Sequence, residues 1–327
     1  MRQHNQIGDM LCSLTLYKAL KKKYPNAWIT LVAAKTNYEI PFFDINPYID
    51  RVIIFNKSSI KTIIGFIRKL RSRKYQLCFV PSTIVLSRTS HILCWISGSR
   101  LRVGVKSIDG KENRSQKYLN LKSKFNWADK HQSIRNLEIA RLVGCDLSEE
   151  EIKSIRFNFE ENDIAYANNF ISEKFPDRNK KIIAFHPGAG KKNNTWNEIK
   201  FIELIKRLHL HFDNYVLITS GWTDDNIVTL IRRELTSSKI KHIILHNAEI
   251  KKLGAILSLV DLYITNDTGT MHIAGYSGAK MISLFGPTNP AEWAPNGIHQ
   301  KHIKSKTNDI NGIAINDVYS LAKTFFN

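Results

Sequence analysis

Cysteine is scarce in this chain of 327 residues, and its four cysteines form no pattern. No two of them stand in a C-x-x-C pair, and no histidine follows at the spacing of metal ligands. These absences argue against a disulfide framework and against a structural zinc site, and they fit a reducing, cytoplasmic compartment. We therefore expect no metal ion and no cofactor. The cysteines are Cys12, Cys78, Cys94 and Cys145.

Long apolar runs are also lacking. Nowhere do about 18 or more uncharged apolar residues stand together, as a membrane-spanning helix requires. The opening residues, MRQHNQIGDM, contain no apolar core of the kind that signal peptides carry. We expect a chain that does not cross a membrane. Its 43% hydrophobic and 24% charged residues are typical of a globular protein.

Acidic residues are outnumbered, with 29 Asp and Glu against 48 Lys and Arg, which gives a formal net charge of +19. Residues 1–165 hold 28 basic and 15 acidic residues, a net +13, which leaves +6 for the rest. Such a field favours nucleic acid, phosphorylated glycans or anionic lipid head groups as partners. A genome rich in lysine codons would give the same bias. Because no helix-turn-helix, zinc-finger or RNA-binding motif accompanies the charge, we expect no nucleic-acid partner.

Short β-branched runs alternate with helical patterns along the whole chain, which indicates parallel sheets wrapped by helices. The length suits two α/β domains of roughly 150 residues each. We expect doubly wound domains over residues 1–160 and 161–312, a closing helix over 313–327, and a ligand cleft at the carboxyl ends of the strands. The predicted strands are Trp28–Ala33, Arg51–Phe55, Gln76–Val80, Leu101–Val105, Lys181–His186, Tyr215–Thr219, His242–Leu245, Asp261–Thr265 and Lys280–Phe285.

One expected element is missing at the start. A doubly wound domain normally begins with a buried apolar strand that leads into its first loop and helix. Here the chain opens directly at a polar loop, Gln3 to Gly8. The N-terminal sheet is therefore predicted to lack its first strand.

The first motif is Ile7-Gly8-Asp9-Met10, which precedes a helical pattern over Leu11–Tyr24. Gly8 permits a tight turn, and Asp9 falls at the start of the helix, where its carboxylate can accept from free backbone N–H groups. An ordinary helix cap would explain this placement. The functional alternative is a general base at the mouth of the cleft.

Two further motifs follow predicted strands of the second half. His186-Pro187-Gly188-Ala189-Gly190 leads to Lys191 and Lys192, a turn in which glycine lets backbone amides approach a phosphate. A charged turn that only faces solvent would have the same sequence pattern. Asn266-Asp267-Thr268-Gly269 leads directly into a helix, so the amides of Thr268 and Gly269 are predicted to point toward an anion such as a diphosphate.

Taken in this order, the three motifs resemble glycosyltransferase family 9, the heptosyltransferases of lipopolysaccharide core assembly. The similarity covers most of the chain, and its most specific stretch is DTGTMHIAGYSGAKMISLFGPTNP. The resemblance implies a GT-B fold and an inverting, metal-independent glycosyltransferase. It also implies that the N-terminal domain takes a lipopolysaccharide core or glycolipid acceptor and that the C-terminal domain takes the nucleotide sugar, commonly ADP-heptose.

The family's site residues can be carried over to positions of this chain. The acidic base corresponds to Asp9, the diphosphate contacts to Thr268 and Gly269, and a contact with the donor sugar to Asp267. The acidic residue that contacts the ribose falls at Asp224 or Asp225. One position departs from the family, because Asn194 stands where a phosphate-binding lysine is common; Gly188, Lys191 and Lys192 lie nearby in sequence as further donor contacts.

The stretch Ile60–Lys74 places apolar residues among Lys and Arg at helical spacing. Such a basic amphipathic helix is typical of a protein that lies on the inner membrane surface, although a helix that faces the core with a basic outer side gives the same pattern. Other functions also remain open. A GT-B epimerase would act on the donor alone, and a degenerate paralogue would bind a nucleotide sugar or glycan without turnover.

Overall fold

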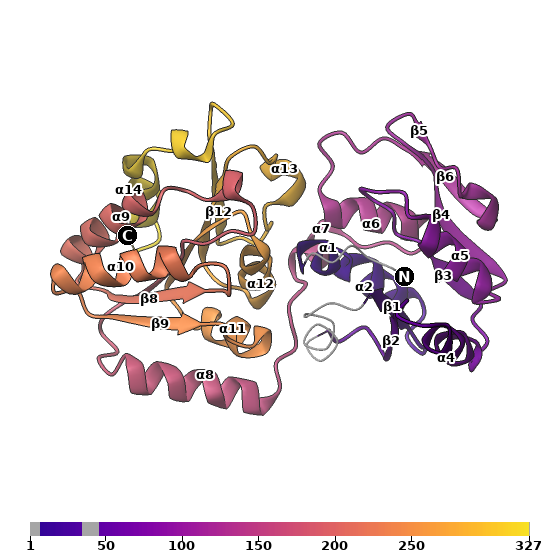
Figure 1. Cartoon of the computed structure of the whole chain (residues 1–327), viewed down its shortest axis with the longest axis horizontal. Helices are drawn as coiled ribbons and strands as arrows, with labels where there is room; N and C mark the ends of the chain where they lie inside the picture. Colours follow the sequence, from indigo (N-terminus) through magenta and orange to yellow (C-terminus); the bar gives the residue numbers. More distant parts are fainter. Residues whose placement is uncertain (1–6, 35–45, 327) are drawn as a thin grey trace. The chain divides into compact units, whose positions relative to one another are not determined.

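The computed structural model describes residues 7–34 and 46–326, which divide into two compact units, Met1–Ile155 and Arg156–Asn327 (Figure 1). The division lies five residues before the boundary expected from the sequence. Most of the opening loop predicted at residues 3–8 lies outside the described residues, and its last two residues, Ile7 and Gly8, belong to helix α1 (Ile7–Cys12) instead. The predicted lack of a first strand also falls outside the described residues.

The second unit is built on a six-stranded parallel sheet in the order β12-β11-β10-β7-β8-β9. Both middle strands, β7 and β10, are buried at every position, as expected of strands that are covered on both faces. The strands are β7 (Ile182–His186), β8 (Tyr215–Ser220), β9 (His242–His246), β10 (Leu262–Asn266), β11 (Met281–Phe285) and β12 (Gln300–Lys304).

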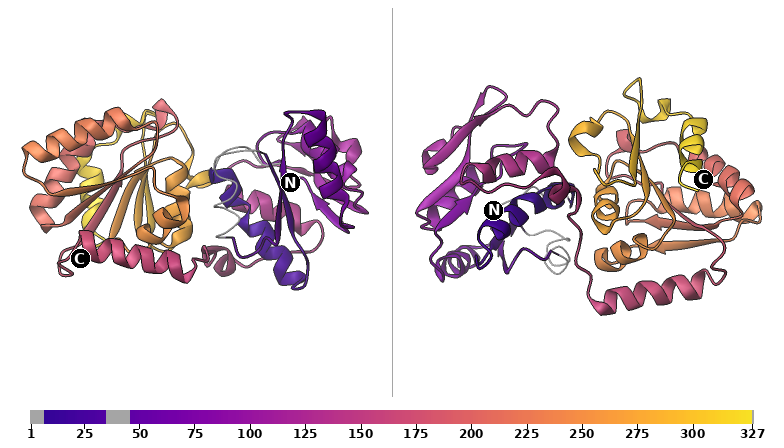
Figure 2. Two further views of the ribbon diagram at one scale, coloured as in Figure 1. Left: turned by 60° about the horizontal axis from the view of Figure 1, so that its bottom comes forward. Right: turned by 180° about the vertical axis from the view of Figure 1, so that it is seen from behind.

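Helices lie on both sides of this sheet (Figure 2). On one side α9 packs against β8, α10 and α14, and on the other α11 packs against α8 and α12. The core on the first side includes Trp196, Phe201 and Phe185, all fully buried. The helices are α8 (Glu161–Lys174), α9 (Glu198–Phe212), α10 (Asp225–Ser237), α11 (Ile250–Leu257), α12 (Gly269–Ser277), α13 (Pro290–Trp293) and α14 (Ile315–Lys323), with short 3-10 turns η2 (Lys192–Asn194) and η3 (Ile310–Gly312).

The first unit contains two separate small sheets within its described residues. Strands β1 and β2 pair in parallel, while β4 pairs with β3, β5 and β6. The strands are β1 (Thr30–Ala34), β2 (Arg51–Phe55), β3 (Leu77–Phe79), β4 (Leu101–Ile108), β5 (Lys111–Glu112) and β6 (Leu121–Phe125). The helices are α1 (Ile7–Cys12), α2 (Leu14–Lys23), α4 (Ile60–Arg71), α5 (Arg88–Ile96), α6 (Gln132–Arg141) and α7 (Glu149–Lys153), with the 3-10 turn η1 (Gln116–Tyr118).

Strand β1 is buried like a central strand, although its pairing is that of an edge. Leu31, Val32 and Ala33 are all buried, which means that both faces of the strand are covered. Within the described residues, however, β1 pairs only with β2, and β3 pairs only with β4. Helix α5 contributes to the apolar packing of both sheets. Leu93 belongs to one cluster with Val32 of β1 and Phe66 of α4. Cys94 belongs to a second cluster, against which Cys78 of β3 packs.

All nine predicted strands overlap observed ones, and the closing helix expected over 313–327 is present as α14. The structure adds β5, β6 and β12, whose polar sequences gave no apolar alternation. The expected helix over Leu11–Tyr24 is interrupted at Ser13, whose hydroxyl donates to the carbonyl of Met10 at 2.6 Å. None of the helices in the described ranges is both long and apolar enough to span a bilayer.

Candidate donor site

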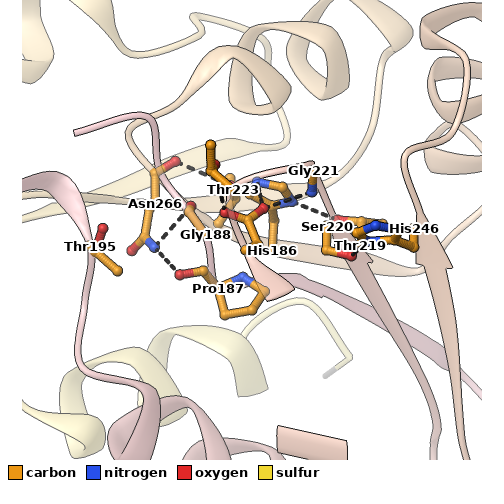
Figure 3. Close-up of polar contacts among 12 residues, drawn as sticks. His186, Pro187, Gly188, Thr195, Thr219, Ser220, Gly221, Thr223, His246 and Asn266 are labelled. Atoms are coloured by element: carbon orange, nitrogen blue, oxygen red, sulfur yellow. Dashed lines mark hydrogen bonds and ion pairs between the residues drawn. The ribbon is translucent and has the colours of Figure 1, made fainter. Parts of the chain in front are cut away.

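Loops of the second unit converge at the carboxyl edge of its sheet. Because all six strands are parallel, the turns after β7, β8 and β10 leave from the same edge, where open α/β sheets bind their ligands. The turn after β7 carries Gly188, the turn after β8 carries Asp224, and the turn after β10 carries Asp267. The sheet order thus brings together motifs that are 30 to 80 residues apart in the printed sequence, as in the close-up of Figure 3.

Asn266 connects two of these loops. Its side chain is fully buried at the end of β10, and Nδ2 donates to the carbonyls of Pro187 at 2.8 Å and Gly188 at 3.2 Å (Figure 3). Its Oδ1 accepts from the backbone N–H of Trp196 at 3.2 Å. One amide therefore fixes the Gly188 turn and the start of the segment that leads into α9. An amide suits this position because it can donate and accept at once.

Gly188 lies directly against the carboxylate of Asp224. A Cβ atom at residue 188 would fall 2.2 Å from Asp224 Oδ1, so only glycine fits between this backbone and that side chain. Asp224 itself is buried, and its Oδ2 accepts from the backbone N–H of Gly221 at 2.7 Å. Oδ1 accepts from the hydroxyl of Thr223 at 3.3 Å. The buried Asp224 carboxylate thus packs directly against the backbone of the glycine turn.

His186 completes this support. Its Nε2 lies 3.8 Å from Asp224 Oδ2, and its Nδ1 lies 3.0 Å from the hydroxyl of Thr219. Burial lowers the pKa of His186 below the ordinary imidazole value, and the neighbouring Asp224 carboxylate opposes that shift. Since burial is the larger effect, we expect a neutral ring at pH 7 that packs beside the Asp224 carboxylate.

The second acidic residue of the edge, Asp267, is paired with Asn194. Nδ2 of Asn194 donates to Asp267 Oδ2 at 2.9 Å, and Asn194 is buried within η2. Burial raises the pKa of Asp267, while a hydrogen bond from Thr288 and the charge of Lys191 lower it. The departure noted in the sequence thus has a structural counterpart, because the residue in the lysine position is a neutral amide bound to the Asp267 carboxylate.

The cations of the second motif lie on the surface. Lys191 and Lys192 are both exposed, and Lys191 is near enough to Asp267 for its charge to act on that carboxylate. Lys191 also precedes η2, and its carbonyl accepts from the backbone N–H of Asn194 at 2.9 Å. Of the two lysines, Lys191 is therefore the one that the fold associates with the edge.

Thr268 and Gly269 stand at the amino end of α12, as the sequence predicts. Thr268 is the N-cap residue, and its side chain makes no capping hydrogen bond. The first N–H groups of a helix have no acceptor within the helix, and the helix dipole adds partial positive charge at this end. The start of α12 can therefore receive an anion.

Next to the glycine turn lies a second polar group, formed by Ser220, Asp225 and His246. Ser220 Oγ lies 2.9 Å from His246 Nδ1, and His246 Nε2 lies 3.5 Å from Asp225 Oδ1 (Figure 3 shows the Ser220 contact). Asp225 is exposed, in contrast to the buried Asp224. The sequence left open whether Asp224 or Asp225 contacts the ribose, and the structure gives these two carboxylates different surroundings.

Asp9 belongs to the first unit. It lies in the first turn of α1 and is partly exposed, and its charge contributes to the raised pKa of Cys12, which burial dominates. Thr15 in α2 donates to the carbonyl of Ser133 at 2.7 Å, which ties this helical segment to α6. The helix that directly follows the one carrying Asp9 is thus anchored to α6 by a buried hydrogen bond.

Sequence reasoning did not assign roles to His186 or Asn266. Their signal was present, because each is a polar residue that ends an otherwise apolar, buried strand. Its meaning depended on the sheet order, which places β7 between β8 and β10. Across residues 7–34 and 46–326, no three His, Cys, Asp or Glu side chains gather in a group that could hold a metal ion.

Comparisons with known proteins identify the family. The family model described as glycosyltransferase family 9 (heptosyltransferase) matches residues 63–319. Lipopolysaccharide heptosyltransferase 3 of Escherichia coli is 25% identical over 310 residues, which covers 90% of this chain and 84% of that protein.

Solved structures show the same fold. A family 9 glycosyl transferase from Veillonella parvula superposes with a TM-score of 0.82 at 16% identity and covers 99% of this chain and 95% of that one. Heptosyltransferase WaaC of E. coli, solved with ADP, gives a TM-score of 0.74 at 16% identity over 99% of this chain and 100% of that one. The chain has the GT-B fold, and it belongs to glycosyltransferase family 9.

Proposed function

We propose that this glycosyltransferase transfers heptose from ADP-heptose to a lipopolysaccharide core acceptor, with inversion at the anomeric carbon and without a metal ion. Relatives that cover about 90% of the chain include lipopolysaccharide heptosyltransferases, and one structural neighbour was solved with ADP. The single observation that carries the proposal for the donor is the convergence of Gly188, Asp267 and the start of α12 at one sheet edge.

The diphosphate of the donor is assigned to the start of α12 and the Gly188 turn. The N–H groups at Thr268 and Gly269 supply hydrogen-bond donors and partial positive charge, which suits the charge that gathers on a departing diphosphate. Lys191 is the nearby cation, and Lys192 is a second exposed one. Asp267, held by Asn194, is assigned to a hydroxyl of the donor sugar.

Asp225 rather than Asp224 is the better candidate for the ribose. Both oxygens of Asp224 accept hydrogen bonds from the protein, and the side chain is buried beneath Gly188. Asp225 is exposed one residue later, at the first position of α10. Asp224 is thus a positioning residue for the glycine turn, and Asp225 is the carboxylate that a ribose hydroxyl can reach.

The proposed reaction is a direct displacement. The acceptor hydroxyl attacks the anomeric carbon of the heptose while the bond from that carbon to the diphosphate oxygen breaks, and the electron pair of that bond leaves with ADP. Asp9 takes the proton of the attacking hydroxyl, a task worth roughly 10² to 10⁴ in rate. The preorganised amides of the second unit stabilise the leaving diphosphate.

Peripheral binding to the cytoplasmic face of the inner membrane is part of this proposal. One side of α4 packs into the core through Phe66 and Leu70, while Ile60 and Ile64 are 78% and 46% exposed. Residues 51–108 contain twelve Lys and Arg and no Asp or Glu. Exposed apolar residues surrounded by cations suit a surface of anionic lipid, where a glycolipid acceptor would reside.

Vesicle sedimentation tests this membrane contact. We expect the chain to sediment with vesicles of anionic lipid and not with zwitterionic ones, and to be released at high salt because the attraction is screened. The double variant Ile60→Ser, Ile64→Ser should bind more weakly, while Leu210→Ser, a control at an 89% exposed residue of the second unit, should not. Equal binding by both variants would contradict a contact through α4.

Thermal shift with ADP-, UDP-, GDP- and CDP-linked sugars tests the donor assignment. A ligand that binds only the folded chain raises its melting temperature. We expect the largest shift with ADP-heptose, followed by ADP release only when lipopolysaccharide core acceptor is added. Conversion of the donor without acceptor would indicate an epimerase, and a shift without any turnover would indicate a binding protein.

A further inference from the structure

Two aromatic rings at the edge of the second unit have no role in the proposal above. We infer that Trp222 and His246, here called the aromatic corner, stack the nucleobase of the donor. This inference rests on the proposed function, because it needs a nucleoside diphosphate as ligand. Trp222 follows β8 and His246 ends β9, so both stand at the carboxyl edge that carries Gly188 and Thr268.

Trp222 is unusual in its exposure. Its side chain is 82% exposed, although tryptophan is among the most highly buried residue types on average. The fold therefore keeps a large planar apolar surface open at the ligand edge. Its ring centroid lies 6.3 Å from that of His246, with 69° between the ring planes. At this angle, a base could stack on the face of the Trp222 ring, and the His246 ring would lie beside one edge of that base.

The His246 ring is held in place. Its Nδ1 lies 2.9 Å from Ser220 Oγ, its Nε2 lies 3.5 Å from Asp225 Oδ1, and the amide of Asn247 also contacts Nε2. The backbone N–H of Asn247 donates to the carbonyl of Ser220 at 2.9 Å, which extends the pairing of β8 with β9 beyond the strand ends. A ring fixed by several contacts loses little freedom when a ligand stacks against it.

The position of the aromatic corner matches the order of parts in a nucleotide. Along the edge the strands follow the order β10-β7-β8-β9, with neighbours about 4.8 Å apart. A diphosphate at the start of α12, after β10, would place the ribose and base over β8 and β9, two to three strand spacings or about 10 to 14 Å away. Asp225, the ribose candidate, lies between Gly188 and the aromatic corner in this arrangement. The base then meets Trp222.

Stacking predicts a preference among bases. A purine covers more of an indole ring than a pyrimidine does, and base stacking on an aromatic side chain changes affinity by about 5- to 150-fold when that side chain becomes alanine. The aromatic corner therefore favours ADP over UDP, independently of any hydrogen bond to the base. Its contribution should be absent for a ligand without a base.

Binding measurements on the full chain test this inference. The variants are Trp222→Ala, Trp222→Phe and the control Trp95→Ala, which removes a 57% exposed tryptophan of the first unit. The ligands are ADP, UDP and inorganic pyrophosphate, the last measured by competition with ADP. We expect Trp222→Ala to weaken the binding of ADP by about 5- to 150-fold and the binding of pyrophosphate not at all. Trp222→Phe should retain most of the affinity, and Trp95→Ala all of it.

The outcomes separate the inference from the proposed function. If the wild-type chain binds ADP and Trp222→Ala binds it equally well, the aromatic corner is not the base site, and the donor proposal still stands. If Trp222→Ala weakens ADP and pyrophosphate alike, Trp222 shapes the loop rather than stacking the base, which also overturns the inference. If the wild-type chain binds no nucleoside diphosphate, both the inference and the proposed function fail.

Discussion

Replacement of Gly188 by alanine tests the support beneath the glycine turn. The new Cβ would lie 2.2 Å from Asp224 Oδ1, so either the backbone or the carboxylate must move. Forcing extra atoms into a packed region costs about 1 to 3 kcal/mol. Moving Asp224 instead would break its bond with the N–H of Gly221, and hydrogen bonds to charged groups contribute about 1.5 to 3 kcal/mol. We therefore expect a loss of about 2 to 3 kcal/mol in the free energy of unfolding.

Urea unfolding measures this loss, and Gly190 supplies the matched control. A Cβ at residue 190 meets no atom within 4 Å, so Gly190→Ala should be neutral or slightly stabilising. The affinity for ADP should fall in Gly188→Ala, because the turn assigned to the diphosphate is displaced, and should be preserved in Gly190→Ala.

A double-mutant cycle identifies the cause. Asp224→Ala removes the atoms that the new Cβ at residue 188 would meet. In that background, Gly188→Ala should therefore lower the free energy of unfolding by less than about 0.5 kcal/mol, as substitutions without such a clash do. If Gly188→Ala costs as much with Asp224 absent as with Asp224 present, the contact between these two residues does not explain the glycine. Equal losses for Gly188→Ala and Gly190→Ala would refute the reasoning as well.

Two further variants examine the Asp267 pair. Burial raises the pKa of Asp267, so stability should fall as pH rises from the ordinary carboxyl pKa through the raised one, and Asp267→Asn should remove this loss. In urea titrations, Asp267→Asn should have a higher free energy of unfolding than the wild-type chain at pH 7, and the difference should vanish near pH 4. Equal differences at both pH values would contradict the raised pKa. Asn194→Lys places a cation beside the same carboxylate and should tighten ADP binding in calorimetry, whereas weaker binding would mean that the amide is needed as it stands.

The strands were predictable because their signal is local. Runs such as Ile182–His186 and Met281–Phe285 are apolar and β-branched, and any parallel sheet would bury them. The short edge strand Gln300–Lys304 is largely polar, so only its pairing with β11 reveals it. Apolar residues also precede α5, but the helix begins only at Arg88, because Ser87 caps it and Ile84 and Val85 before it are exposed.

The sequence predicted the loops of the candidate site but not the contacts that join these loops to one another. The sequence places glycine and acidic residues after strands, and parallel strands bring those loops to one edge. It could not decide between Asp224 and Asp225, since the difference depends on Gly188, which lies 36 positions earlier in the printed sequence. The contact between Asn194 and Asp267 depends equally on distant segments.

The proposed transfer chemistry depends most directly on Asp9. Turnover should be measured as ADP release from ADP-heptose in the presence of lipopolysaccharide core acceptor, for the wild-type chain and for Asp9→Asn, alongside the affinity of each for ADP. We predict that kcat falls by about 10² to 10⁴ while ADP affinity is unchanged, because the base acts on the acceptor and not on the donor. An Asp9→Asn variant that turns over at nearly the wild-type rate would contradict the account.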